Sequence, residues 1–301
     1  MSYLKSLLIG SASLIACTLL SSSATWATPK VRAVASFSIL GDMVSRVGGD
    51  LVEVTTIVGA NADTHVYEPK PADAVALSHT QIFFVNGLGF EGWMDRLVQS
   101  TVFKGTTVTA STGVKTRRME EDGQEITDPH AWQNLGNGLL YVKNIADGLC
   151  RVEPEACPTF RKNAAAYSTE ISALDTEVKE RISAVPEAKR KVITTHDAFG
   201  YFGAAYGVSF LAPEGISTES EASAADVAKL IAQIKREGVT ALFVENMSDP
   251  RLIEQIGKET GVKIGGEIYA DALSEKGQGG ATYIEMFKHN ISLLAPAMSG
   301  S

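Results

Sequence analysis

The longest helical pattern in the chain lies between Pro158 and Pro186. Apolar residues recur along it at steps of three and four: Phe160, Ala164, Tyr167, Ile171, Leu174, Val178 and Ile182. This spacing predicts one amphipathic helix, because it places all seven side chains on a single face, and the two prolines mark its ends. At 1.5 Å per residue such a helix is ~40 Å long. We therefore predict that residues 158–185 form a rigid connector between two lobes.

The segments on both sides of this helix alternate predicted strands with predicted helices. The predicted strands cover residues 31–40, 52–58, 81–86, 191–195, 208–213, 240–246 and 263–270. Such alternation is typical of parallel βαβ units. The predicted fold class is α/β, with one lobe over residues 28–157 and a second over residues 186–301. No internal sequence repeat is visible, and the charged segment 112–127 is expected to be a loop.

The N-terminus has the pattern of a secretory signal. Lys5 precedes an apolar run from Leu7 to Leu20, and Thr25 and Ala27 stand where a signal peptidase reads small residues. We predict that residues 1–27 are removed and that the mature protein is periplasmic. A transmembrane anchor is less favoured, because the run is short and interrupted.

A lipoprotein signal is the second alternative for this segment. Leu14, Ile15, Ala16 and Cys17 resemble a lipobox, which would place a lipid on Cys17. We rank lipid anchoring second, because the apolar Leu19 and Leu20 are unusual near the start of a mature lipoprotein. Either form of processing leaves Cys150 and Cys157 as a pair. In an exported chain this pair is a plausible disulfide, since a thiolate metal site would need further sulfur or histidine nearby.

The overall composition excludes some functions. The chain has 27 basic and 35 acidic residues, a net charge of −8, which argues against a nucleic-acid surface and suits attraction of cations. Gly87, Gly89 and Gly92 match a dinucleotide fingerprint after a strand. We reject that match, because residues 107–113 lack the acidic residue that should bind the ribose.

Four residues occupy loops that follow predicted strands or precede helices, two in each half: His65, His130, His196 and Asp271. Taken singly, each has an ordinary explanation as a loop or structural residue. They are too far apart in sequence to form a local motif, but a two-lobed α/β fold can bring strand-end loops together across a cleft. Imidazole and carboxylate are ligands for a borderline divalent cation, and four of them close a tetrahedron with no position for a reactive water.

The chain resembles the periplasmic solute-binding proteins that feed zinc or manganese to ATP-driven importers. The resemblance covers nearly the whole mature chain and is carried by DTHVYEP, DPHAW, THDAFGYF and YADALSEKG, with the long helix between the second and third. It implies two lobes joined by a stiff helix, with a metal between them held by His65, His130, His196 and Asp271. It implies a binding protein, not an enzyme, that captures Zn(II) with high affinity and delivers it to the permease of an ABC transporter. We expect a monomer, with a periplasmic metallochaperone as a further candidate partner.

The identity of the metal depends on His196. Family members similar to manganese importers usually place a glutamate there, and a third imidazole instead favours zinc. Many zinc members also carry a histidine-rich loop before DPHAW, whereas residues 112–127 contain no histidine. Some zinc members also lack that loop, so the third imidazole decides the expectation. Zn²⁺ is the expected cargo, with Mn(II) or Fe(II) as the alternative.

A more distant alternative is an exported zinc hydrolase. It would need three protein ligands, a metal-bound water and a general base such as Glu68 or Glu214. No pair of histidines four apart on a helix is present, and Asp271 would fill the fourth position. A surface adhesin role is a third class, which can accompany metal binding. For the binding protein we expect affinity to fall as the pH drops toward ~6.5, and the glycine-rich loop after Asp271 to control release.

Overall fold

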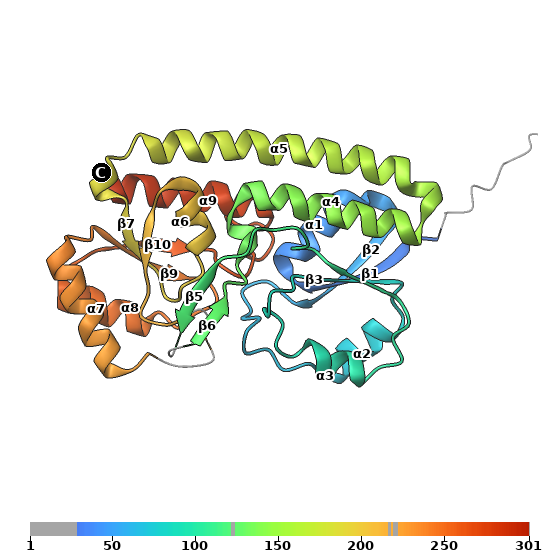
Figure 1. Ribbon diagram of the computed structural model, residues 1–301, viewed down its shortest axis with the longest axis horizontal. Coiled ribbons are helices and arrows are strands. Elements are labelled where there is room, and N and C mark those ends of the chain that lie inside the picture. Colours follow the sequence, from blue (N-terminus) through green and yellow to red (C-terminus); the bar gives the residue numbers. More distant parts are fainter. Residues whose placement is uncertain (1–28, 122–123, 216–217, 219–221, 301) are drawn as a thin grey trace, which may run out of the picture.

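Two parallel sheets form the framework of the computed structural model, which describes residues 29–121, 124–215, 218 and 222–300 (Figure 1). The first has the order β2-β1-β3-β4, from β1 (Val31–Phe37), β2 (Val52–Val58), β3 (Ile82–Val85) and β4 (Thr106–Thr109). The second has the order β10-β9-β7-β8, from β7 (Lys191–Ile193), β8 (Ser209–Leu211), β9 (Ala241–Glu245) and β10 (Ile264–Ile268). The prediction of an α/β protein with two lobes is confirmed. The predicted signal, residues 1–27, lies outside the described residues.

Helices cover both faces of each sheet (Figure 1). In the first lobe they are α1 (Ser38–Gly48), α2 (Pro71–Ser78), α3 (Met94–Gln99) and α4 (Leu135–Val152). In the second they are α6 (Gly200–Tyr206), α7 (Ala224–Glu237), α8 (Arg251–Thr260) and α9 (Tyr283–Ser299). Coverage on both faces explains the nearly continuous apolar runs of the strands, since a parallel sheet of this kind has no solvated face. No helix among the described residues is both long enough and apolar enough to cross a bilayer.

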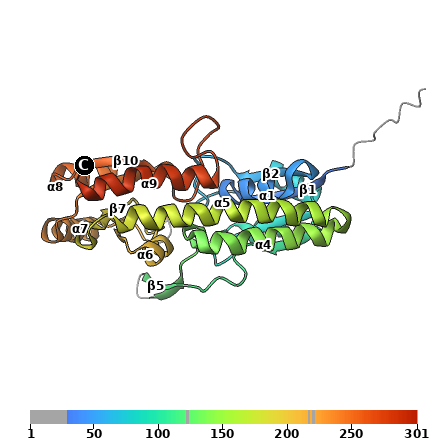
Figure 2. The same ribbon diagram turned by 90° about the horizontal axis from the view of Figure 1, so that it is seen from above.

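The long helix α5 (Cys157–Ser183) runs along both lobes, as Figures 1 and 2 show. Its buried residues are the seven predicted from the spacing, Phe160, Ala164, Tyr167, Ile171, Leu174, Val178 and Ile182. One continuous apolar core includes Phe37 of the first lobe, Tyr167 of α5 and Phe202 of the second lobe. A shared core resists separation of the lobes, because opening them would expose packed apolar surface to water.

Two features adjoin this framework. Cys150, in the last turn of α4, is joined by a disulfide to Cys157, the first residue of α5. The expectation that segment 112–127 is only a loop is wrong, because β5 (Arg118–Glu121) and β6 (Gln124–Thr127) form an antiparallel pair that stands off the body (Figure 2). The Asp122-Gly123 sequence between them is typical of a hairpin turn, but the many charged residues of the segment led to its interpretation as a loop.

Candidate metal centre

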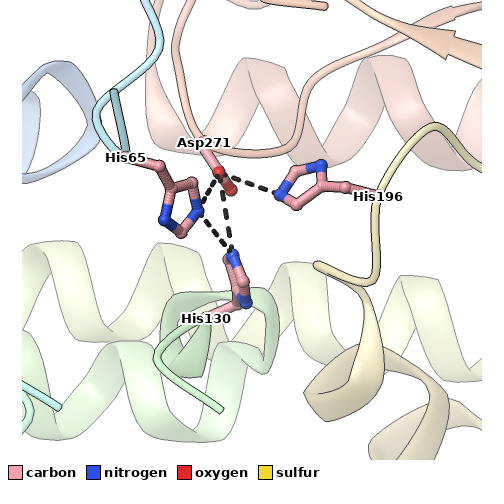
Figure 3. Close-up of side chains that lie close together, drawn as sticks. All are labelled: His65, His130, His196 and Asp271. Atoms are coloured by element: carbon pink, nitrogen blue, oxygen red, sulfur yellow. Dashed lines mark hydrogen bonds and ion pairs between the residues drawn. The ribbon is translucent and has the colours of Figure 1, made fainter. Parts of the chain in front are cut away.

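The structure brings together the four residues named from the sequence, although they come from four different segments (Figure 3). His65 lies in the loop after β2, and His130 precedes the short helical turn Ala131–Gln133. His196 follows β7, and Asp271 follows β10. All four side chains are buried, and one potential ligand atom from each lies within 4.8 Å of the others.

The distances match the size of a site for one small cation. Asp271 Oδ2 lies 3.1 Å from Nε2 of His65, 3.1 Å from Nε2 of His196 and 3.6 Å from Nε2 of His130. The Nε2 atoms of His65 and His130 are 3.3 Å apart. Four ligand atoms at zinc's bond lengths of about 2.0–2.1 Å would form a tetrahedron with edges of about 3.3–3.4 Å. Four of the six distances between these atoms are therefore close to the edges of a tetrahedral site, and all six lie within 4.8 Å.

One atom of the cluster has no other use. Asp271 Oδ1 is buried and has no hydrogen-bond partner among the residues that the structure describes. A buried carboxylate oxygen without a partner is costly, and a bound cation would satisfy it. A bound cation would likewise satisfy the facing Nε2 atoms of His65 and His130, because these atoms can hydrogen-bond to each other only if one of them carries a proton.

Carboxylates set the charge of the imidazoles. Burial alone would lower the pKa of His130, but Asp271 and Asp128 raise it to about 9. Burial also opposes protonation of His196, yet Glu245 and Asp271 raise its pKa well above the ordinary value. Burial alone would raise the pKa of Asp271, but His196 and His130 lower it well below its usual range. Without a metal, the cluster therefore holds protons that an incoming cation must displace.

Two carboxylates behind the cluster were not identified from the sequence. Asp128 Oδ1 accepts hydrogen bonds from the backbone N–H of His130 (3.0 Å) and from its Nδ1 (2.9 Å). Glu245 accepts from Nδ1 of His196 and from its backbone N–H. Each interaction leaves Nε2 facing the centre, which is the usual arrangement behind metal-bound histidines. The available signal was position, since Asp128 lies in the DPHAW segment and Glu245 ends a buried strand.

Aromatic residues shield the cluster on the side of the first lobe. The Phe90 ring lies 4.9 Å from that of His65, and the Trp132 ring lies 5.3 Å from that of His130. Phe90 lies within the turn that matched a dinucleotide fingerprint, between Gly89 and Gly92. In this turn the N–H groups of Asn86 and Gly87 donate to the buried carboxylate of Glu91. They are thus satisfied internally, which agrees with the rejection of that match.

The hydrolase alternative gains no support from Glu68. That residue is exposed and lines a surface pocket of about 470 Å³ together with Arg96, with none of the four cluster residues among its lining. Asp271 adds a fourth candidate ligand atom to the three imidazoles, and four protein ligands are typical of a closed zinc site, not of a catalytic one.

Two α/β lobes fastened by one continuous helix around a buried imidazole and carboxylate cluster define a class of binding proteins that hold a small cation. The family model described as "Zinc-uptake complex component A periplasmic" matches residues 33–297, and the chain belongs to this family. It is accordingly the substrate-binding component of a metal ABC transporter, and such components work with a membrane permease and an ATPase.

Relatives named for different metals are similar to this chain in sequence. The manganese-binding lipoprotein MntA of Halalkalibacterium halodurans is 33% identical over 89% of this chain and 89% of its own length. The iron ABC transporter substrate-binding lipoprotein MtsA of Streptococcus pyogenes serotype M1 is 35% identical over 90% of this chain and 89% of its own. Among solved structures, the periplasmic zinc binding protein TroA from Treponema pallidum is similar with a TM-score of 0.85 and 28% identity, covering 90% of this chain and 99% of that one.

Proposed function

We propose that this protein binds Zn(II) outside the cytoplasmic membrane and delivers it to the permease of an ABC importer. The proposed ligands are the imidazoles of His65, His130 and His196 and the carboxylate of Asp271. The observation that carries the proposal is the convergence of three Nε2 atoms and one carboxylate on a single buried point (Figure 3). Family membership supports the transport role.

Zinc is preferred over manganese and iron because of the donor set. Three nitrogens and one oxygen suit zinc, whereas manganese prefers oxygen. Mn(II) or Fe(II) is the alternative cargo, and two observations favour it. Relatives carry the names of manganese and iron, and Asp271 Oδ1 is available as a second oxygen ligand. The choice therefore depends most on His196, the position where a glutamate would change a nitrogen ligand to oxygen.

The mode of export is a separate part of the proposal. Both relatives compared by sequence are named lipoproteins, which favours a lipid on Cys17 more than the sequence alone did. Cleavage after Ala27 to give a free periplasmic protein is the other form. In either form we propose that the protein acts as a monomer, and that a periplasmic metallochaperone is a candidate source of its metal.

Release is proposed to depend on the loop after Asp271, not on wide separation of the lobes. Leu273 in this loop accepts a hydrogen bond from the N–H of Asn61 and donates one to Ser38 Oγ, each 2.9 Å long. A cavity of about 780 Å³ separates other parts of the loop from α1. Leu273 itself belongs to the shared core, whereas residues 275–279 are exposed, so this outer part of the loop can move while the core stays packed. Equal hydrogen exchange of residues 272–282 in metal-free and zinc-bound protein would contradict this mechanism.

The metal assignment is tested by elemental analysis of protein isolated with its native metal, together with competitive titration of Zn(II) and Mn(II). We expect one tightly bound zinc per chain. A His196→Glu variant should shift relative affinity toward manganese, because it replaces a nitrogen ligand by oxygen. Retention of manganese over zinc by both proteins equally would reject the zinc assignment. Turnover of ester, peptide or phosphate substrates by the metal-loaded protein would favour the hydrolase instead.

A further inference from the structure

Arg117, just before β5, connects the first lobe to the second beside the cluster. Its backbone C=O accepts from the N–H of Asp128 (3.1 Å), so the two residues are paired at the base of the hairpin. Its side chain reaches the second lobe, where Nη1 donates to the carbonyl of Gly200. The guanidinium lies 5.7 Å from the ring centre of Tyr201, whose hydroxyl accepts from the Arg117 N–H (3.0 Å).

Asp128 links this arginine to the metal centre. Its side chain is fully buried, with Oδ1 engaged by His130 as described above. Its other oxygen, Oδ2, has no hydrogen bond among the described residues, and Arg117 Nε lies 3.6 Å from it. Arg117 thus faces the Oδ2 side of the carboxylate, while Oδ1 stays directed at His130.

Gly200 of the second lobe lies directly against Asp128 and Arg117. A Cβ atom on Gly200 would lie 2.7 Å from Asp128 Oδ2 and 2.9 Å from Arg117 Cζ. Those separations are too short for a side chain, so the start of α6 lies close against the carboxylate and the guanidinium only because the residue is glycine. The position of the second lobe is thereby transmitted through two contacts to the imidazole of His130.

We propose that Arg117 is a positioning residue, which fastens Asp128 to Gly200 of the opposite lobe, fixes the imidazole of His130 and so slows dissociation of the metal. This inference rests on the proposed metal-binding function and adds a residue that touches neither the metal nor a ligand. Supports behind a ligand typically change metal affinity 10–100-fold when removed. We therefore expect about a tenfold faster dissociation when the guanidinium is lost.

The test compares Arg117→Gln with Arg118→Gln in the full chain. Arg118 is the neighbouring arginine, it is exposed, and it pairs with Glu125 on the hairpin at 3.6 Å. Zinc dissociation is followed by stopped-flow mixing with excess chelator, and the melting temperature is measured with and without zinc. Arg117→Gln should release zinc about ten times faster and show a smaller zinc-induced rise in melting temperature. Arg118→Gln should match the wild type in both.

A dissociation rate for Arg117→Gln within twofold of wild type would overturn the inference, as would an equal acceleration in Arg118→Gln. If Arg117→Gln does not fold, Gly200→Ala takes its place, because the added methyl displaces the same pair without removing a charge. Faster release in Gly200→Ala supports the inference, and an unchanged rate rejects it. Stoichiometric zinc binding by the wild type in the same assay tests the proposed function separately.

Discussion

Glu245 provides the sharpest test of how the centre is built. It accepts hydrogen bonds from the backbone N–H of Thr195 (2.9 Å) and His196 (3.1 Å), and its second oxygen accepts from His196 Nδ1. In Glu245→Gln the amide oxygen can keep the backbone bonds, but the amide NH₂ then faces Nδ1–H. Two donors cannot bond each other, so the ring must rotate or move its proton to Nε2, the atom proposed to bind the metal.

The expected magnitude depends on pH, because two effects oppose each other. Loss of the charged acceptor should weaken intrinsic metal affinity 10–100-fold, which is about 1.4–2.7 kcal/mol. Glu245 also raises the pKa of His196, so its removal reduces the competition between protons and metal. That competition grows as the pH falls. The metal affinity of the variant should therefore fall furthest below that of the wild type near pH 8, and this difference in affinity should become smaller toward pH 6.

Competition titration against a chromophoric chelator at several pH values measures both effects. Glu91→Gln is the matched control, because Glu91 is also a buried carboxylate, and it accepts hydrogen bonds from the backbone N–H groups of Asn86 and Gly87, just after β3. Glu91 differs from Glu245 in its side-chain partner, because it accepts a hydrogen bond from the Ser36 hydroxyl and Glu245 accepts one from the His196 ring. We expect the control to change stability while metal affinity stays within about threefold, well inside the range expected for a ligand support. Equal losses in both variants, or a deficit in Glu245→Gln that widens at low pH, would refute the reasoning.

Three further predictions concern protons and stability. Because the pKa of His130 is about 9, zinc binding at pH 7 should release protons, seen by calorimetry in buffers of different ionisation enthalpy, and affinity should keep rising above the ~6.5 expected from an unperturbed histidine. Burial raises the pKa of Asp42 to about 6 from 3.8, so ionised Asp42 opposes folding above pH ~6 and has no effect below both values. Asp42→Asn should increase the unfolding free energy at pH 7.5 by at most ~3 kcal/mol, seen as a higher urea midpoint, and this gain should disappear near pH 4. Cys150→Ser should lower unfolding free energy by about 2.5 kcal/mol through loop entropy, with unchanged metal affinity, since the disulfide and His130 lie at opposite ends of α4.

The parts of the fold that the sequence predicted are those governed by local periodicity. The buried face of α5 could be predicted residue by residue, because a helix repeats its environment every three or four positions. The similar strand order of the two sheets could not be predicted from the sequence. Counted from its first strand, each sheet places the second strand on one side and the third and fourth on the other. That order is a property of strand pairing over long distances, and it persists without any visible repeat in the sequence.

The sequence indicated which four residues lie together in the cluster, but not which residues support them. Strand-end positions and family resemblance singled out the four cluster residues, and the structure places them together. Arg117 and Glu245 gave no comparable signal, because an arginine in a charged segment and a glutamate at the end of a strand are both ordinary in sequence. Their roles follow only from contacts with residues distant in the chain, His196 for Glu245 and Gly200 for Arg117.

The charge balance of the centre bears on how a buried site, in which only His65 is partly exposed, would exchange a cation. Bringing a divalent cation into a closed core is costly unless charge is compensated there. In the metal-free state the raised pKa values of His130 and His196 keep positive charge beside Asp271. An entering divalent cation that displaces those two protons leaves the net charge of the core unchanged. We infer that exchange needs only a path for the ion past the loop after Asp271, and that the shared core and α5 can stay rigid throughout.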